Sequence, residues 1–394
     1  MPRFFSFRTL ATFARSAIFA DTPVYVQFYI TARCNLTCFQ CNIRYSNADL
    51  PECSLDEVKR IADNLARIGT GIVLLTGGEP FSRVDLPEII REFVSRGIHV
   101  RMQTNGLANE EAIHKVIEYG GNDISISLDS LNPKTQEWIN GGFPGSWHRA
   151  LRAMSIFTKY LPKTSSFASI GCVLQSKNLF DIEALIRFGT RIGWYTSLVP
   201  VHVTNQLNPR GFCTFDRSLQ LQPDDYPLAD DLLSRLQTMR DQGFLLYDSD
   251  QYIANFRLFI RGERLTWRDR HDGVCDSPNL YFAVLPNGDL APCCDWRLEE
   301  RRVPVGSPEF PRLFHDQTLR KDLFAITSAC PGCMYGSFPE MTISMRHLNA
   351  KLQRIKTFMA APPPKPWPIS YERMLEIAEE IRNTSNDSAK RTDK

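Results

Sequence analysis

Short apolar runs and stretches of helical periodicity alternate along the first half of the chain. The apolar run Tyr25–Thr31 predicts a strand. Ser54 and Glu57 have the spacing of a capping box and predict a helix that ends near Ile68. The same alternation continues to about residue 202. Further strands are predicted at 72–75, 99–103, 123–128, 168–174 and 197–202, and further helices at 86–96, 110–119, 147–160 and 178–192.

Six strands separated by helices predict parallel βαβ units. Right-handed crossovers would curl such a sheet into a full or partial barrel, so the expected fold is α/β, a partial (β/α)6 barrel of the triosephosphate isomerase type. In such barrels the chemistry lies at the carboxyl ends of the strands. Residues that directly follow the predicted strands are therefore the first candidates for a site.

The alternation stops after Pro209. A polar helical stretch near 224–242 follows, then a cysteine-rich segment, a stiff proline-rich linker at 362–368 and a short helix at 371–382. The expected divisions are an N-terminal amphipathic segment (1–22), the partial barrel (23–230), a helical linker (231–270), a small hairpin and helix domain (271–340) and a helical tail with a disordered end (341–394).

The N-terminal segment has no acidic residue before Asp21. Arginines alternate there with apolar and hydroxyl residues. We interpret the segment as an amphipathic helix that covers the bottom of the barrel; a transit peptide and a membrane-surface helix are the alternatives.

Composition narrows the function classes. The chain has 394 residues, of which 43% are hydrophobic and 23% charged, and a net charge of +2, which gives no basic face for nucleic acid. Eleven cysteines without a secretory signal favour metal ligands over a disulfide framework. No apolar run approaches the ~20 residues of a transmembrane segment. We therefore expect a soluble, cytoplasmic protein.

The loop after the first strand carries three cysteines, Cys34, Cys38 and Cys41. Three thiolates can hold three irons of a four-iron cluster and leave the fourth iron open, as catalytic metal sites do. Zinc is the alternative, but it usually takes four protein ligands, and no fourth Cys or His follows closely.

Polar and glycine residues follow the next strands. Gly77, Gly78 and Glu79 come after the second; glycines allow close approach to a ligand, and a carboxylate complements an ammonium group. Asn105, Ser127 and Asp129 end the third and fourth strands, where turn chemistry is the alternative explanation. Asn178 is expected to cap its helix, with contact to a bound ligand as the alternative.

The cysteine loop, with its Cys-x-x-x-Cys-x-x-Cys spacing, and the residues that follow the next three strands together resemble the radical S-adenosylmethionine (radical SAM) superfamily. The resemblance implies a cluster whose open iron binds S-adenosylmethionine and cleaves it to a 5′-deoxyadenosyl radical, which abstracts a substrate hydrogen atom. It also implies that Gly77, Gly78 and Glu79 receive the methionine amino group, that Asn105 lies near the cofactor, and that Ser127 and Asp129 face the ribose. One position departs from the family: the residue before the last cysteine is usually aromatic, and here it is Gln40.

A second cysteine set lies in the C-terminal half: Cys275, Cys293, Cys294, Cys330 and Cys333. The apolar run 280–285 with the turn at 286–288 predicts a β-hairpin between the first two. The spacing resembles the auxiliary-cluster modules called SPASM and twitch domains. That resemblance implies one further four-iron cluster on Cys275, Cys293, Cys330 and Cys333, with Cys294 as the alternative to Cys293 and a zinc ribbon as the alternative site.

The resemblance implies a radical SAM oxidoreductase, or a related radical enzyme, reduced by a flavodoxin- or ferredoxin-type donor. A cluster fully ligated by protein is expected to carry electrons, which favours a net oxidation or bond formation. The short stretch before the first strand favours a small-molecule substrate (a sugar, cyclitol or lipid head group) over a ribosomally made peptide. A non-catalytic metal-binding or electron-transfer protein is the remaining alternative.

Overall fold

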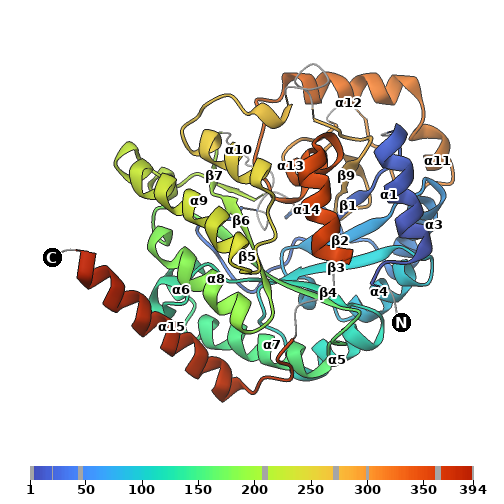
Figure 1. The fold of residues 1–394 in the computed structure, drawn as a ribbon. Helices are drawn as coiled ribbons and strands as arrows, with labels where there is room; N and C mark the ends of the chain where they lie inside the picture. The colour runs from blue at the N-terminus through green and yellow to red at the C-terminus, as the bar shows by residue number, and fades with distance from the viewer. Residues whose placement is uncertain are drawn as a thin grey trace.

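The computed structural model describes residues 4–19, 21–42, 48–205, 212–268, 275–298, 301–359 and 365–392. A mostly parallel sheet lies at the centre, with helices around it (Figure 1). Its strand order is β10-β9-β1-β2-β3-β4-β5-β6, and strands β1 to β6 pair in parallel. The α/β class and the partial barrel expected from the sequence are confirmed.

The barrel elements follow the predicted alternation closely. Its strands are β1 (Tyr25–Thr31), β2 (Ile72–Gly77), β3 (His99–Thr104), β4 (Asp123–Ser127), β5 (Phe167–Leu174) and β6 (Tyr195–Pro200). Its helices are α3 (Leu55–Arg67), α4 (Leu86–Val94), α5 (Glu110–Glu118), α6 (Pro133–Ile139), α7 (Ser146–Tyr160) and α8 (Ile182–Arg191). Helix α6 was not predicted, because its seven residues give too short a periodic pattern.

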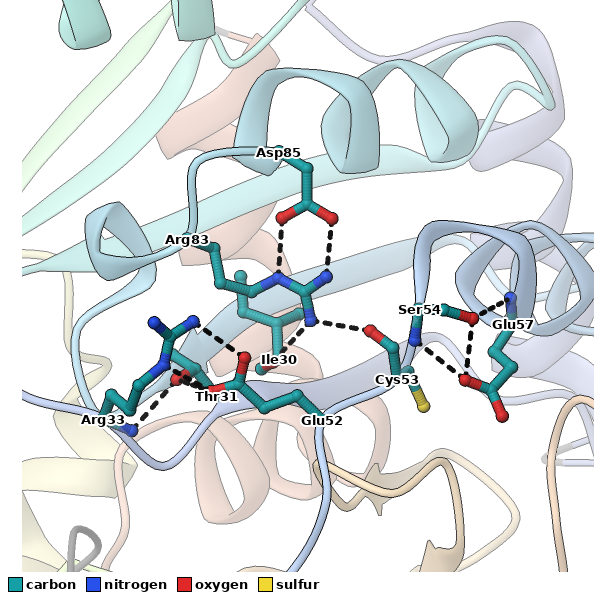
Figure 2. Close-up of polar contacts among 9 residues, drawn as sticks. All are labelled: Ile30, Thr31, Arg33, Glu52, Cys53, Ser54, Glu57, Arg83 and Asp85. Carbon is teal, nitrogen blue, oxygen red and sulfur yellow. Dashed lines mark hydrogen bonds and ion pairs between the residues drawn. The ribbon is translucent and has the colours of Figure 1, made fainter.

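Helix α3 shows how the local sequence fixes an element. The side chain of Ser54 accepts a hydrogen bond from the Glu57 amide, and the Ser54 amide donates to the Glu57 carboxylate at 2.8 Å (Figure 2). Such a cap stabilises a helix by about 1 kcal/mol. Val58, Ile61 and Leu65 lie on one face and are buried in the main core.

The C-terminal hairpin joins the barrel sheet directly. Strands β9 (Tyr281–Val284) and β10 (Leu290–Ala291) pair antiparallel, as the sequence predicted. Strand β9 also pairs in parallel with β1, in the register Tyr25↔Tyr281 to Phe28↔Val284. The outer edge of β1 is thereby covered, in keeping with the burial of all seven β1 residues.

The N-terminal helix α1 (Phe7–Phe19) lies against the residues that directly precede β2. The Arg8 guanidinium donates to the Thr70 carbonyl at 2.7 Å, and the Thr12 hydroxyl donates to the Gly69 carbonyl at 2.8 Å. Helix α1 therefore covers the amino ends of the barrel strands. No helix in the described ranges is long and apolar enough to cross a membrane.

Further helices pack around the barrel (Figure 1). They are α9 (Tyr226–Asp241), α10 (Asp250–Ile260), α11 (Phe310–Leu313), α12 (Gln317–Ala329), α13 (Ser337–Arg346), α14 (Leu348–Met359) and α15 (Tyr371–Thr392). Helix α15 continues past Arg382, where the predicted helix ended and disorder was expected. The first half of the predicted proline-rich linker lies outside the described residues; beyond it, Trp367 is buried and its ring N–H donates to the Ile192 carbonyl.

Candidate active site

A cavity of about 520 Å³ runs along the inner face of the barrel sheet. Its lining includes Ile72 and Gly77, the two ends of β2, so it extends roughly 17 Å along the strands. Every predicted residue of the first site lines it: Cys34, Cys38, Cys41, Gly77, Gly78, Glu79, Asn105, Ser127 and Asp129. Residues from four separate loops thus meet at the carboxyl end of the sheet.

The three-cysteine loop is held by α6 and the residue that follows it. The Phe39 amide donates to the Ile139 carbonyl at 3.0 Å, and the Cys38 thiol donates to the Asn140 side-chain carbonyl at 3.5 Å. Burial raises the pKa of the Cys38 thiol, and nearby Cys41, Asp129 and Cys34 raise it further. The three thiols therefore lie near one another.

Two arginines hold the chain on either side of this loop (Figure 2). Buried Arg83 donates to the carbonyls of Ile30 and Cys53 and forms an ion pair with Asp85 at 2.6 Å. Arg33 donates to the Glu52 carboxylate, which also accepts the hydroxyl proton of Thr31. These contacts fix the end of β1, where the cysteine loop begins.

Gly77 and Gly78 lie directly against the backbone at the start of the cysteine loop. A Cβ on Gly77, which has a φ of +143°, would lie 2.1 Å from the Thr31 carbonyl oxygen, and one on Gly78 would lie 2.0 Å from that of Arg33. The Gly78 and Glu79 amides donate to these two carbonyls at 2.8 Å. The glycines thus allow close approach to the cysteine loop backbone as well as to a ligand in the cavity.

Glu79 presents a fixed, buried carboxylate to the cavity. It accepts hydrogen bonds from the Thr104 hydroxyl at 2.7 Å, the Asn105 amide at 2.8 Å and the Phe81 amide at 3.1 Å. Burial raises its pKa to about 6, while these hydrogen bonds act in the opposite direction. The group is therefore ionised near neutral pH and oriented to receive a cation.

Asp129 is oriented by the residue that departs from the family pattern. One carboxylate oxygen accepts from the Gln40 side-chain amide at 3.0 Å, and the other accepts from the Val173 amide at 2.7 Å. Burial raises the pKa of Asp129 to about 6. The aromatic neighbour Phe39 is outside the cavity lining and packs on Trp138, with ring centroids 4.9 Å apart.

Gln40 offers a test of whether a cofactor fits. Its side-chain carbonyl oxygen is buried and has no hydrogen-bond partner in the part of the chain that the structure describes. Gln40 lines the cavity, so a bound group with an N–H donor would satisfy that oxygen. The carboxylates, the unpaired acceptor and the three thiols together fit a cluster with an amino-bearing cofactor beside it.

Two asparagines hold loops around the cavity. The Asn105 side chain donates to the Asn35 side-chain carbonyl at 2.7 Å and accepts from the Leu107 amide, so it forms a turn and also braces the cysteine loop. Asn178 was expected to cap a helix, and this is wrong: its side chain makes no capping hydrogen bond. It donates instead to the carbonyls of Asp129 and Val173 at 2.8 and 2.9 Å.

The second cysteine set also converges. Burial raises the pKa of Cys275 to about 12, with contributions from Cys293 and Cys330, and both of these also raise the pKa of Cys333. Cys294 differs, because it is buried and lines the main cavity, whereas the other four cysteines of this set lie outside the cavity lining.

Among the residues that the structure describes, no three His, Cys, Asp or Glu side chains are close enough to share one metal ion. Thiolates around a four-iron cluster each bind a different iron, so they lie farther apart than the ligands of a single zinc ion.

Comparisons with known proteins agree with this geometry. Residues 28–189 match the family model described as Radical SAM superfamily. An AdoMet-dependent heme synthase from Methanosarcina barkeri (strain Fusaro / DSM 804) is 31% identical over 208 residues, 52% of this chain and 56% of the relative. The mycofactocin maturase MftC of Mycobacterium tuberculosis (strain CDC 1551 / Oshkosh) is 24% identical over 276 residues, 69% of this chain and 65% of the relative.

The solved structure of native anSMEcpe with bound AdoMet and Cp18Cys peptide has the same fold. The TM-score is 0.55 at 17% identity, over 93% of this chain and 99% of that one. The chain spans between about half and two thirds of the length of the two curated relatives.

Proposed function

The chain belongs to the radical SAM superfamily, and we propose that it cleaves S-adenosylmethionine reductively and abstracts a hydrogen atom from a substrate held in the barrel cavity. One observation carries the proposal: the three-cysteine loop, the Gly77–Glu79 turn and Asp129 line a single cavity. The superfamily implies one four-iron cluster and S-adenosylmethionine. When bound, the cluster supplies the electron that breaks a carbon–sulfur bond of the cofactor.

In this proposal the chain orients the cofactor with groups that are already fixed. Cys34, Cys38 and Cys41 bind three irons. The Glu79 carboxylate, held by its three donors, accepts the methionine ammonium group, and the Gly78 backbone lies beside it. Asp129 and Ser127 face the ribose, and the unpaired carbonyl of Gln40 accepts a hydrogen bond from the adenine amino group.

A second cluster on the C-terminal cysteines is part of the proposal. Cys293 and Cys330 both lie close enough to Cys275 and Cys333 to raise the pKa of those two thiols, which supports a shared site. The placement of Cys294 toward the main cavity favours Cys293 as the ligand. Four protein ligands would leave no open iron, so a cluster held there would supply an electron acceptor, which favours a net oxidation or bond formation. The proposed ligands are Cys275, Cys293, Cys330 and Cys333.

The proposed substrate is a small molecule. A single cavity of about 520 Å³ has to hold both the cofactor and the substrate, which leaves room for a small molecule or one side chain. The relative named a heme synthase supports a small molecule. A ribosomally made peptide is the second candidate, favoured by the similarity to the maturase MftC over 69% of this chain.

A flavodoxin- or ferredoxin-type donor is the proposed reductant. Phe39, in the cysteine loop, and Trp138 are exposed, and their rings contact each other at a tilted angle. Exposed aromatic pairs are typical anchors of protein interfaces. We therefore place the donor over this pair, beside Cys38.

The test is anaerobic iron and sulfide analysis with Mössbauer spectroscopy, comparing the wild type with the Cys34→Ala/Cys38→Ala/Cys41→Ala variant. We expect about eight irons in the wild type and about four in the variant. Dithionite and S-adenosylmethionine should give 5′-deoxyadenosine with the wild type only. Zinc in place of iron, or an iron-loaded wild type that leaves S-adenosylmethionine intact, would refute the proposal.

A further inference from the structure

The cavity reaches the surface at the end of the barrel opposite the cysteine loop. Among the described residues that line it, three are exposed: Ala14 and Ala17 on α1 and Ile355 on α14. Both helices therefore border the cavity on this side. The stacked rings of Phe4 and Phe358, with centroids 5.7 Å apart, join the segment before α1 to α14. The mouth of the cavity therefore lies between α1 and α14.

The character of the lining changes from the mouth inward. The side chains of α1 and α14 that line the cavity are mostly apolar, with Lys351 and Arg354 as basic exceptions, whereas polar and apolar side chains are mixed along the barrel interior. The mouth residues are Phe13, Ala14, Ala17, Met345, Ile355 and Phe358. The interior residues include Gln27, Arg101, Gln103, Ser125, Ser197 and Glu340. The interior thus offers hydrogen-bond partners to a polar group, and the helices at the mouth offer apolar contacts with Lys351 and Arg354 beside them.

Both helices at the mouth present an apolar stripe to solvent. On α1, Phe7 and Ile18 are each 74% exposed, and with Ala14 they follow the i, i+7, i+11 spacing of one helix face. On α14, Leu348, Leu352 and Ile355 are exposed at i, i+4 and i+7. The apolar lining of the mouth is thus continuous with an apolar outer surface.

The charged side chains of α1 and α14 are all basic, and one of them, Arg354, is paired with Glu340 of α13. Neither α1 nor α14 contains an acidic residue, and no Asp or Glu occurs from residue 341 to residue 371. Arg15 is paired with Asp21, but Lys351 and Lys356 form no ion pair with any residue of the described chain. Lys356 is exposed beside Leu352 and Ile355. Lysines next to exposed apolar residues are suited to anionic lipid head groups.

We propose that the α1–α14 face docks on an anionic membrane surface and that the substrate is an amphiphilic lipid, which enters head group first. Docking places the mouth against the bilayer, so the apolar tail stays among the mouth residues or in the membrane. The polar head group then reaches through the barrel, roughly 17 Å, toward the cysteine loop. The part of this inference that concerns the reacting head group rests on the proposed function; the docking face does not.

Vesicle flotation tests the docking face directly. The reconstituted full chain is mixed anaerobically with vesicles of phosphatidylcholine alone, or of phosphatidylcholine and phosphatidylglycerol in a ratio of roughly three to one. We expect binding to the mixed vesicles that weakens with added salt. Ile18→Glu or Leu352→Glu should lower the partition coefficient roughly tenfold or more, and Lys356→Ala about fivefold. The matched control is Phe324→Glu on α12, whose parent side chain is 57% exposed, against 53% for Leu352.

The binding of the variants to vesicles decides whether α1 and α14 form the docking face. Binding that is lost in the α1 and α14 variants and kept in the control supports the inference, provided that the variants unfold at the wild-type temperature. No wild-type binding, or equal binding by every variant, overturns it. A wild-type dimer in sedimentation velocity that Leu352→Glu converts to a monomer also overturns it, because the face would then join two copies of the chain. Cleavage of S-adenosylmethionine is scored separately without vesicles, so failure of the proposed function leaves the docking result interpretable.

Discussion

Replacing Gly78 by alanine tests whether the glycine turn supports the cysteine loop. The new Cβ would lie 2.0 Å from the Arg33 carbonyl oxygen and 2.5 Å from its carbon. Both are backbone atoms, so no flexible side chain can move aside to relieve the overlap. The turn and the loop must separate, which breaks the hydrogen bonds from the Gly78 and Glu79 amides to the Thr31 and Arg33 carbonyls.

The loss of stability caused by Gly78→Ala can be estimated from these contacts. Two hydrogen bonds at about 1 kcal/mol each, plus about 1 to 3 kcal/mol for overpacking, lower the free energy of unfolding by roughly 3 to 5 kcal/mol. A domain with a stability of about 5 to 15 kcal/mol remains mostly folded after such a loss. Displacement of Arg33 also shifts Cys34, the next residue. We therefore expect Gly78→Ala to lose the cluster of the cysteine loop and to keep the C-terminal one.

Urea unfolding measures the stability, and Mössbauer spectroscopy with iron analysis measures the clusters. Gly306→Ala is the matched control, because its Cβ would meet its nearest neighbour, an Ile61 side-chain atom, at an ordinary 3.5 Å. A Gly78→Ala protein with wild-type iron content and wild-type cleavage of S-adenosylmethionine would refute the reasoning. Equal losses of stability and iron in both variants would show that the close approach of Gly78 to the Arg33 carbonyl is not the cause.

Three further predictions concern the chemistry of the two sites. Gln40→Leu removes a hydrogen bond to Asp129 and the unpaired carbonyl, so the Kd for S-adenosylmethionine should rise roughly tenfold by equilibrium dialysis; an unchanged Kd would contradict the adenine contact. Because burial raises the Glu79 pKa to about 6, the affinity for S-adenosylmethionine should fall as the pH drops through 6 and the carboxylate is protonated. The Glu79→Gln variant should bind S-adenosylmethionine weakly at every pH. A wild-type affinity that does not change with pH would argue against the contact between Glu79 and the ammonium group. Cys293→Ala should lose about four irons and Cys294→Ala none, and the reverse pattern would make Cys294 the ligand.

The sequence predicted what depends on local patterns. The Ser54–Glu57 capping box and the apolar run Tyr25–Thr31 gave elements whose bounds match the structure closely. The loops after the strands converge because parallel strands bring their carboxyl ends to one edge. Placement of Cys34, Glu79 and Asp129 in one cavity follows from this rule alone.

Contacts between segments that are distant in the sequence could not be predicted from local sequence patterns. Nothing in the short segment of α6 indicates that Ile139 and Asn140 hold the cysteine loop. The bond from Gln40 to Asp129 was missed because the family pattern places an aromatic residue at that position. The mouth between α1 and α14 depends on two helices separated by most of the chain.

The parallel pairing of β9 with β1 also affects how the chain is made. Strand β1 leaves the ribosome long before its partner at Tyr281–Val284, because strands β2 to β6 and their helices are synthesised between the two. Until then the outer edge of β1, with unpaired N–H and C=O groups, is open to other strands. The nascent chain therefore depends on a late segment to close its sheet, and a translational stop before β9 would leave an aggregation-prone fragment.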